Sequence, residues 1–412
     1  MRAAWRWAIA QQMDEAIDQS LEGLRWFYDM RSWFHEAQEA FGRAAEAVAA
    51  SPDHDGKNRL LGRLGVCQGG AYFRLGRYEQ SRELIQKSIA IFRQLDERAE
   101  LAFALIALGH VALYQRGRDN AQQCYEESLA LHRQIGHARR MVEALNGLGV
   151  VLRERGQYAE ARQSLEQALT LARQINNRWR ISFVLNNLGI VARMMGDYQA
   201  AKAHYQESLK LKQEFGDSRG AAISLNNLGN IACALEEYKE ALKLHQESMA
   251  LCKEIGDRMG VARSLNNLGM VAHEQGRYSE ARRYHEESLA LKLEINDQRG
   301  AIHSFNHLGK ALAELGEPGP AAQYFRRALK SAMEMQAMPL ALDALEEMAE
   351  LLVKQRQVER AAELLTLVRR HPASEQRTKD QADRWLADLV FAAPQGKPRS
   401  LDAVVSELLA ER

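Results

Sequence analysis

Apolar residues recur along most of the chain at the spacing of an amphipathic helix. Around residue 190 two such runs follow one another, and Gly196 and Tyr198 lie between them. The runs consist of Leu185, Leu188 and Val191, and then of Ala201, Tyr205, Ser208 and Leu209. This arrangement predicts a helix, a short turn and a second helix.

The pattern repeats every 40 residues, and two positions held by small residues mark its register. The first position holds Gly69, Gly109, Gly149, Gly189, Gly229, Gly269 and Gly309, followed by Ala349. The second lies twelve residues later and holds Ser81, Ala121, Ala161, Ala201, Ala241, Ala281, Ala321 and Ala361. Glycine within a helix costs ~1 kcal/mol relative to alanine, so its recurrence indicates a close helix–helix approach. We expect the small residue twelve positions later to form the other side of this contact.

The junctions between units carry signals that end one helix and begin the next. Gly216 and Gly256 lie where a helix ends in a left-handed residue, and asparagine takes that place at Asn176 and Asn296. An aspartate suited to cap the next helix follows at positions 217, 257 and 297. Each unit is therefore predicted to begin directly after these residues.

The central units share the consensus LNNLGxVAxxxGxYxxAxxxxxESLxLxxEIGDxxG, which resembles the tetratricopeptide repeat in a 40-residue form. The resemblance implies an all-α, right-handed solenoid of stacked helix-turn-helix repeats with helical caps at both ends. The eight units cover residues 57–96, 97–136, 137–176, 177–216, 217–256, 257–296, 297–336 and 337–376. Some turns depart from the pattern, because Arg118, Pro318 and Val358 replace the turn tyrosine and Glu236 replaces the turn glycine.

The two ends differ from the repeats. Residues 1–56 hold four tryptophans, Trp5, Trp7, Trp26 and Trp33. We interpret this segment as an aromatic helical cap or degenerate repeat rather than an aromatic ligand site. Residues 377–412 are predicted to form a capping helix, the linker FAAPQGKPRS and a short helix capped by its last residue, Ser400.

The terminal segments RAAWRWAIAQ and PRSLDAVVSELLAER resemble the boundaries of the C-terminal sensor array of bacterial STAND signalling ATPases. The repeats also resemble kinesin-light-chain-like and Pins-like arrays. The first resemblance implies a ligand-sensing module that works with an NTPase module in the same or a partner chain. The sequence itself contains no GxxxxGK[ST] phosphate loop.

Composition narrows the classes of partner. The formal net charge is only +1, which argues against a nucleic acid. The longest uncharged stretch, 101–114, is too short to span a bilayer, so no membrane partner is expected. The four cysteines show no pairing motif and suit a reduced, cytoplasmic protein.

The resemblance places the first helix of each repeat on the concave face of the solenoid. Two rows of asparagines lie there, formed by Asn146, Asn186, Asn226, Asn266 and Asn306, and by Asn187, Asn227 and Asn267, with His307 closing the second row. Asparagine within a helix costs up to ~0.7 kcal/mol relative to alanine, so this set needs a compensating interaction. One interpretation is a groove in which the amides bind the main chain of an extended peptide. The alternative is structural, with the asparagines bonded to one another or to the adjacent repeat.

Other groove positions are expected to discriminate between ligands. They include Phe183, Arg263, Asn230, Lys310, Arg153 and Arg193. The two arginines lie one repeat apart and suit a carboxylate, although pairing of Arg153 with Glu154 is an equally good interpretation.

No catalytic, cofactor or metal site is predicted. His303 and His307 have the spacing of two metal ligands but lack a third. His245 and His285 occupy a position that large residues fill in other units, so we interpret them as core residues. The favoured function is a non-catalytic array that binds a protein or peptide. A quorum-sensing-type peptide receptor and a passive structural scaffold or adaptor remain as alternatives.

Overall fold

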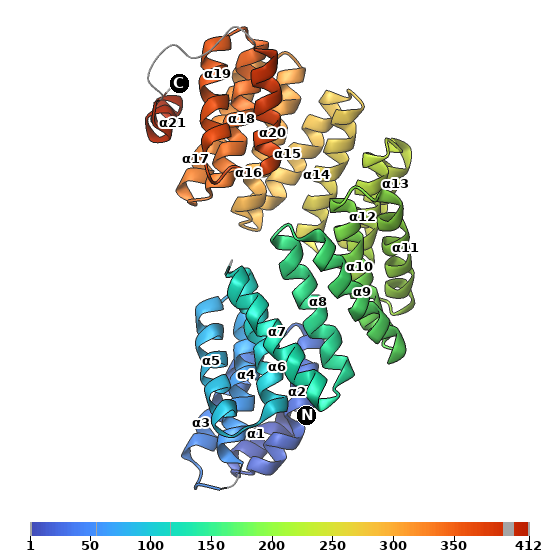
Figure 1. The fold of residues 1–412 in the computed structure, drawn as a ribbon, viewed down its shortest axis with the longest axis vertical. Coiled ribbons are helices and arrows are strands. Elements are labelled where there is room, and N and C mark those ends of the chain that lie inside the picture. The colour runs from blue at the N-terminus through green and yellow to red at the C-terminus, as the bar shows by residue number, and fades with distance from the viewer. Residues whose placement is uncertain (1, 55, 116, 390–398, 411–412) are drawn as a thin grey trace. The chain divides into compact units, whose positions relative to one another are not determined.

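The computed structural model describes residues 2–54, 56–115, 117–389 and 399–410, and within these ranges the regular structure is entirely helical. The chain divides into two compact units, Met1–Leu211 and Lys212–Arg412, with the boundary inside α11. Figure 1 shows the helices coloured in chain order, from blue at the N-terminus to red at the C-terminus. The helices of the first unit are α1 (Arg2–Ala10), α2 (Asp14–Arg31), α3 (Phe34–Ala50), α4 (Lys57–Arg74), α5 (Tyr78–Gln94), α6 (Arg98–Tyr114), α7 (Arg118–Ile135), α8 (Ala138–Glu154), α9 (Tyr158–Gln174), α10 (Arg178–Met194) and α11 (Tyr198–Glu214). Those of the second are α12 (Ser218–Ala234), α13 (Tyr238–Glu254), α14 (Arg258–Glu274), α15 (Tyr278–Glu294), α16 (Gln298–Glu314), α17 (Pro318–Glu334), α18 (Met338–Lys354), α19 (Val358–Arg370), α20 (Gln376–Asp388) and α21 (Leu401–Ala410).

Within each unit the helices pack as consecutive pairs. The first helix of a pair packs on the second, and the second packs on the first helix of the next pair. First helices of neighbouring repeats also contact each other, as α6 does α8 in the first unit and α14 does α16 in the second. Second helices of neighbouring repeats make at most marginal contact among the described residues. Because helices on the inner side of a curved stack lie closer together, the first helices form the inner layer. The predicted all-α repeat solenoid is confirmed.

The residues that end one helix and cap the next adopt the conformations that the sequence predicts. Gly216 and Gly256 both have φ of 69°, and Asn176 and Asn296 have φ of 49° and 57°. The predicted aspartate caps are present at the starts of α12, α14 and α16, where Oδ1 accepts from the backbone N–H three residues later. The N···O distances are 2.9 Å from Gly220 to Asp217, 3.0 Å from Gly260 to Asp257 and 2.9 Å from Gly300 to Asp297.

The register glycines contact a different residue from the one expected. A Cβ added to Gly189 would lie 2.5 Å from the ring of Tyr205, and one added to Gly229 would lie 2.6 Å from the ring of His245. The nearest neighbour is therefore the large residue sixteen positions after the glycine. The small residue twelve positions after it contributes its backbone instead, as Ala161 does at 3.3 Å from Gly149. It is small because it is itself fully buried between helices.

We predict that Glu236→Gly stabilises the protein. Glu236 has φ of 60° at a turn position where other repeats place glycine, including Gly196 at 80°. A left-handed conformation costs a side-chain-bearing residue roughly 1–2 kcal/mol. After the greater freedom of glycine in the unfolded chain is subtracted, we expect a gain of about 1 kcal/mol in urea unfolding. Leu235→Gly is the control, because Leu235 has φ of −92° and should lose stability on the same change. Equal effects of the two substitutions would contradict the explanation.

The terminal segments are helical, as expected. Trp5 is buried and packs edge-on against Phe41 with ring centroids 6.3 Å apart, whereas Trp7 is 59% exposed. The aromatic cap thus has one tryptophan in its core and another on its surface. Ser400 Oγ accepts from the backbone N–H of Ala403 at 3.3 Å and caps α21. Most of the expected linker, residues 391–398, lies outside the described residues.

Candidate ligand-binding surfaces

The predicted asparagines lie on α8, α10, α12, α14 and α16, which belong to the inner layer of their units. We call this set the asparagine ladder, and it comprises Asn146, Asn186, Asn187, Asn226, Asn227, Asn230, Asn266, Asn267 and Asn306. Asn226 and Asn306 are buried, and the other members are half-buried. Within each unit, most members of the ladder are therefore partly accessible without being fully exposed.

Members of the ladder bond to one another between neighbouring repeats. In the first unit Asn187 Nδ2 donates to Asn146 Oδ1 at 2.8 Å. In the second unit Asn267 Nδ2 donates to Asn226 Oδ1 at 3.1 Å and to Asn230 Oδ1 at 3.0 Å. These bonds are the ones that the structural interpretation requires, and they help to offset the poor helix propensity of asparagine. An amide offers two donors and two acceptor lone pairs, so one such bond leaves capacity for others.

The ladder loses its internal partners at its C-terminal end. The side-chain oxygens of Asn266 and Asn306 are buried and have no hydrogen-bond partner. In the preceding repeats the donor lies 41 positions after the acceptor, as Asn187 does after Asn146. The residues 41 positions after Asn266 and Asn306 are His307 and Glu347. Glu347 does not bond to Asn306, because its Oε1 lies 2.7 Å from Lys310 Nζ and its Oε2 is buried without a hydrogen-bond partner. The His307 ring instead stacks on His285 with centroids 5.0 Å apart.

The remaining predicted residues divide into paired and exposed groups. Arg153 forms an ion pair with Glu154 at 2.6 Å, and Lys310 Nζ lies 2.7 Å from Glu347 Oε1. Phe183 is 39% exposed and packs on the ring of Trp179 with centroids 4.3 Å apart. The other two arginines of the predicted set, at positions 193 and 263, are exposed. Arg153 thus has the neighbouring partner that the alternative interpretation gave it.

A buried acidic pair was not predicted as a functional feature. Glu346 and Glu347 on α18 occupy the two ladder positions of their repeat, and both are buried. Burial and the mutual repulsion of the two carboxylates raise the pKa of Glu346 to about 8. Burial also raises the pKa of Glu347 despite the nearby ammonium of Lys310. Glu347 lines a small cavity of about 80 Å³ together with His273 and Lys310.

A larger cavity of about 160 Å³ lies in the first unit, and we call it the N-terminal cavity. It is enclosed by α2, α4, α6, α7 and α8, and its lining includes Leu21, Val66, Cys67, Phe103, His132 and Arg140. These residues were not predicted to lie together, because the cavity includes Leu21 of α2, which lies outside the 40-residue register. Burial raises the pKa of the Cys67 thiol to about 12, so this side chain is an uncharged thiol.

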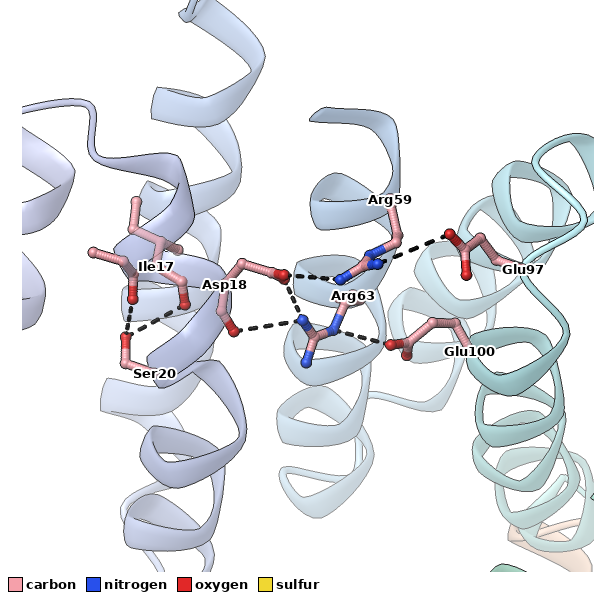
Figure 2. Close-up of polar contacts among 8 residues, drawn as sticks. Ile17, Asp18, Ser20, Arg59, Arg63, Glu97 and Glu100 are labelled. Atoms are coloured by element: carbon pink, nitrogen blue, oxygen red, sulfur yellow. Dashed lines mark hydrogen bonds and ion pairs between the residues drawn. The ribbon is translucent and has the colours of Figure 1, made fainter. Parts of the chain in front are cut away.

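Ion pairs fix α2 against the first repeats. Asp18 on α2 pairs with both Arg59, at 3.0 Å, and Arg63 on α4 (Figure 2). On their other side these arginines reach Glu97, at 3.9 Å, and Glu100, at 3.2 Å, at the start of α6 (Figure 2). The alternating charges of this network hold three inner helices side by side.

Side chains of α2 also reach α8, past the two repeats formed by α4 to α7. Glu22 lies 4.0 Å from Arg140, and the guanidinium of Arg139 lies 5.6 Å from the ring centroid of Trp26. Arg140 additionally lies over the ring of Phe103, 4.1 Å from its centroid. The inner surface of the first unit is therefore crossed by long polar and aromatic side chains.

These helix pairs and their layered inner surface define an α-solenoid repeat protein. Tetratricopeptide repeat family models match residues 66–134, 140–214, 220–294 and 307–376, which is well over half of the chain. The chain belongs to the tetratricopeptide repeat family. The matched families are repeat families, and none is an enzyme family. No curated protein matches the chain significantly.

Several solved structures share the fold at low sequence identity. The apo form of the quorum sensor NprR from B. thuringiensis is 16% identical with a TM-score of 0.56, over 80% of this chain and 97% of that one. The apo form of RapI is 14% identical with a TM-score of 0.54, over 66% and 96%. A STAND protein with a tetratricopeptide repeat sensor from Pyrococcus horikoshii is 15% identical with a TM-score of 0.52. That match covers 90% of this chain and 54% of the STAND protein.

Among the described residues, no three His, Cys, Asp or Glu side chains come together as metal ligands would. None of the helices in the described ranges combines the length and apolar character that crossing a bilayer requires.

Proposed function

We propose that this chain is a non-catalytic module that binds an extended peptide or protein segment along the asparagine ladder. The observation that carries this proposal is the pair of buried, unpartnered side-chain oxygens of Asn266 and Asn306 within a row of amides. Leaving such an oxygen unpaired costs about 1–3 kcal/mol, and a backbone N–H of a bound peptide would supply the missing donor. Neighbouring first helices lie ~10 Å apart. A peptide rising ~3.3 Å per residue would then meet one repeat about every third residue.

We further propose that the array is the ligand-sensing part of a STAND-type signalling protein. The fold similarity to the Pyrococcus horikoshii STAND protein extends over 90% of this chain and supports this role. An NTPase module in the same chain or in a partner chain would then read out the binding event. A receptor for a signalling peptide is the alternative within the same class, supported by the fold similarity to the quorum sensor NprR.

A passive scaffold is a second candidate, favoured by the bonds within the ladder. The hydrogen bond from Asn187 to Asn146 gives both side chains a structural role without any ligand. The two candidates differ in what they require of the unpaired end of the ladder. A scaffold has no use for unpaired side-chain oxygens there, whereas a binding groove needs them.

A comparison of paired and unpaired asparagines tests the proposal. Ligands are first selected from a displayed random-peptide library with the full chain, and their Kd values are measured by fluorescence anisotropy. The double variant Asn266→Ala/Asn306→Ala should lose roughly tenfold in affinity, because two backbone hydrogen bonds are removed. Its stability should not fall, because neither oxygen is bonded in the free protein.

Asn187→Ala is the matched control for this comparison. It breaks the bond to Asn146, so it should cost about 1 kcal/mol of stability in urea unfolding. Affinities unchanged in the stable double variant would exclude these asparagines as the binding site. A library that yields no binder would favour the scaffold.

A further inference from the structure

His132 on α7 belongs to the lining of the N-terminal cavity. This histidine is only 1% exposed, whereas the side chain of Glu22, also in the lining, is 60% exposed. The lining also includes His137, which is exposed and whose ring centroid lies 5.6 Å from that of His132. The cavity thus joins a buried imidazole to exposed side chains.

Both ring nitrogens of His132 lack a hydrogen-bond partner. Burial lowers the pKa of His132 to about 4, so the ring is neutral at physiological pH. A neutral imidazole presents one N–H donor and one acceptor nitrogen. Each costs about 1–3 kcal/mol when buried and left unpaired. The site therefore favours a ligand group that both donates and accepts.

The 40-residue register shows why His132 has no partner. The equivalent positions 80 and 160 residues later hold Lys212 and Lys292. Each of these buried lysines donates to a serine twelve residues further on, Ser224 at 3.0 Å and Ser304 at 2.8 Å. The corresponding residue for His132 is Ala144, which has no polar side chain. His132 therefore lacks the internal partner that these two equivalents have.

The charged residues of the cavity wall are already paired. Arg63 is engaged by Asp18 and by Glu100, and Arg140 lies 3.2 Å from Glu143. A charged ligand would have to break one of these pairs to gain a partner, so the wall favours a neutral group. Between the pairs, the lining residues Leu21, Val66 and Phe103 provide apolar contact.

We propose that the N-terminal cavity binds a neutral aromatic side chain that carries a hydroxyl, a tyrosine of the bound peptide or protein, with the hydroxyl hydrogen-bonded to His132. The hydroxyl can donate to the unprotonated ring nitrogen or accept from the protonated one, so it can pair with one of the two nitrogens in either tautomer. The volume is suitable, since a protein cavity of about 150 Å³ accommodates a benzene ring. This inference rests on the proposed peptide-binding function only for the origin of the tyrosine.

Binding of p-cresol, toluene and benzoate to the full chain tests the cavity without any peptide. Chemical shifts of the His132 ring and calorimetry report occupancy and affinity. We expect p-cresol to bind about tenfold more tightly than toluene, because a hydrogen bond to His132 adds to the same apolar contact. Benzoate should bind more weakly than p-cresol. Equal binding of p-cresol and toluene, tighter binding of benzoate, or no binding of p-cresol would overturn the assignment.

Two variants of the histidine locate the effect. His132→Phe keeps a ring but removes both nitrogens, so it should lose the roughly tenfold preference for p-cresol over toluene. His132→Gln keeps a donor and an acceptor and should retain most of it. A preference that survives His132→Phe would contradict the assignment, and the wild-type comparison decides it if neither variant folds. If peptides bind along the ladder but p-cresol does not bind, this inference alone fails. If p-cresol binds but no peptide does, the proposed function alone fails.

Discussion

Replacing Gly69 by alanine should lower the free energy of unfolding by about 1–3 kcal/mol, because the added methyl group overpacks the contact between α4 and α5. A Cβ at Gly69 would lie 2.7 Å from Ile85 Cγ1 and 3.3 Å from the backbone oxygen of Ser81. Neither atom is the free end of a flexible side chain, so the two helices must separate or Ile85 must change rotamer. Urea titration followed by far-UV circular dichroism measures the loss.

The adjacent glycine provides the control within the same helix. A Cβ added to Gly70 would meet nothing within 4 Å. Alanine there should gain about 0.5–1 kcal/mol from its better helix propensity. A loss of stability for Gly69→Ala together with a gain for Gly70→Ala would separate the effect of helix packing from that of helix propensity. Stabilisation of both variants would mean that the register glycines are not required for close helix approach.

Lowering the pH from 7 to 5 should destabilise the second unit through its buried histidines. Burial lowers the pKa of His245 to about 4 and that of His285 to about 3, and the pKa of His307 falls well below its usual value. Below pH 6.5 the unfolded chain takes up protons at these histidines, whereas the folded chain does not, so stability falls with pH. His245 and His285 each contribute about 2 kcal/mol of loss at pH 5. His307 acts in the same direction. Glu346 opposes this trend, because its raised pKa favours the folded state as the pH falls from 8 toward 4.5.

His285→Phe isolates one part of this dependence. Phe325 occupies the equivalent position in the next repeat, so the substitution suits the site. The variant should lose about 2 kcal/mol less than the wild type between pH 7 and pH 5 in urea unfolding. The reverse change, Phe325→His, should make the loss steeper. Parallel pH profiles for all three proteins would show that these rings are not buried and neutral.

The fold was predictable because its determinants are local and recur eight times. Gly216 and Asn176 marked helix ends through their tolerance of a left-handed backbone, and Asp217 marked the next start through its side-chain cap. These features depend on neighbouring residues, and repetition separated them from chance. The contact of Gly189 with Tyr205 was misassigned, because spacing along a helix indicates which residues share a face but not which atoms meet across two helices.

The candidate sites were only partly predictable for the same reason. The ladder was visible because its asparagines recur in register, and the bond between Asn187 and Asn146 was among the alternatives considered. The N-terminal cavity depends on α2, which lies outside the register. His132 became conspicuous only once the structure showed that its ring has no partner. The relevant signal in the sequence was Ala144 at a position where Ser224 and Ser304 stand in two other repeats.

The reach of α2 to α8 changes how the first unit should unfold. In a linear array each repeat is coupled only to its neighbours, so repeats can fray from the end one at a time. Glu22 and Trp26 instead join the first segment of this unit to Arg140 and Arg139, beyond the repeats that lie between. Loss of α2 therefore removes contacts from three repeats at once. The helices from α2 to α8 should behave as a single cooperative block rather than as a row of independent elements.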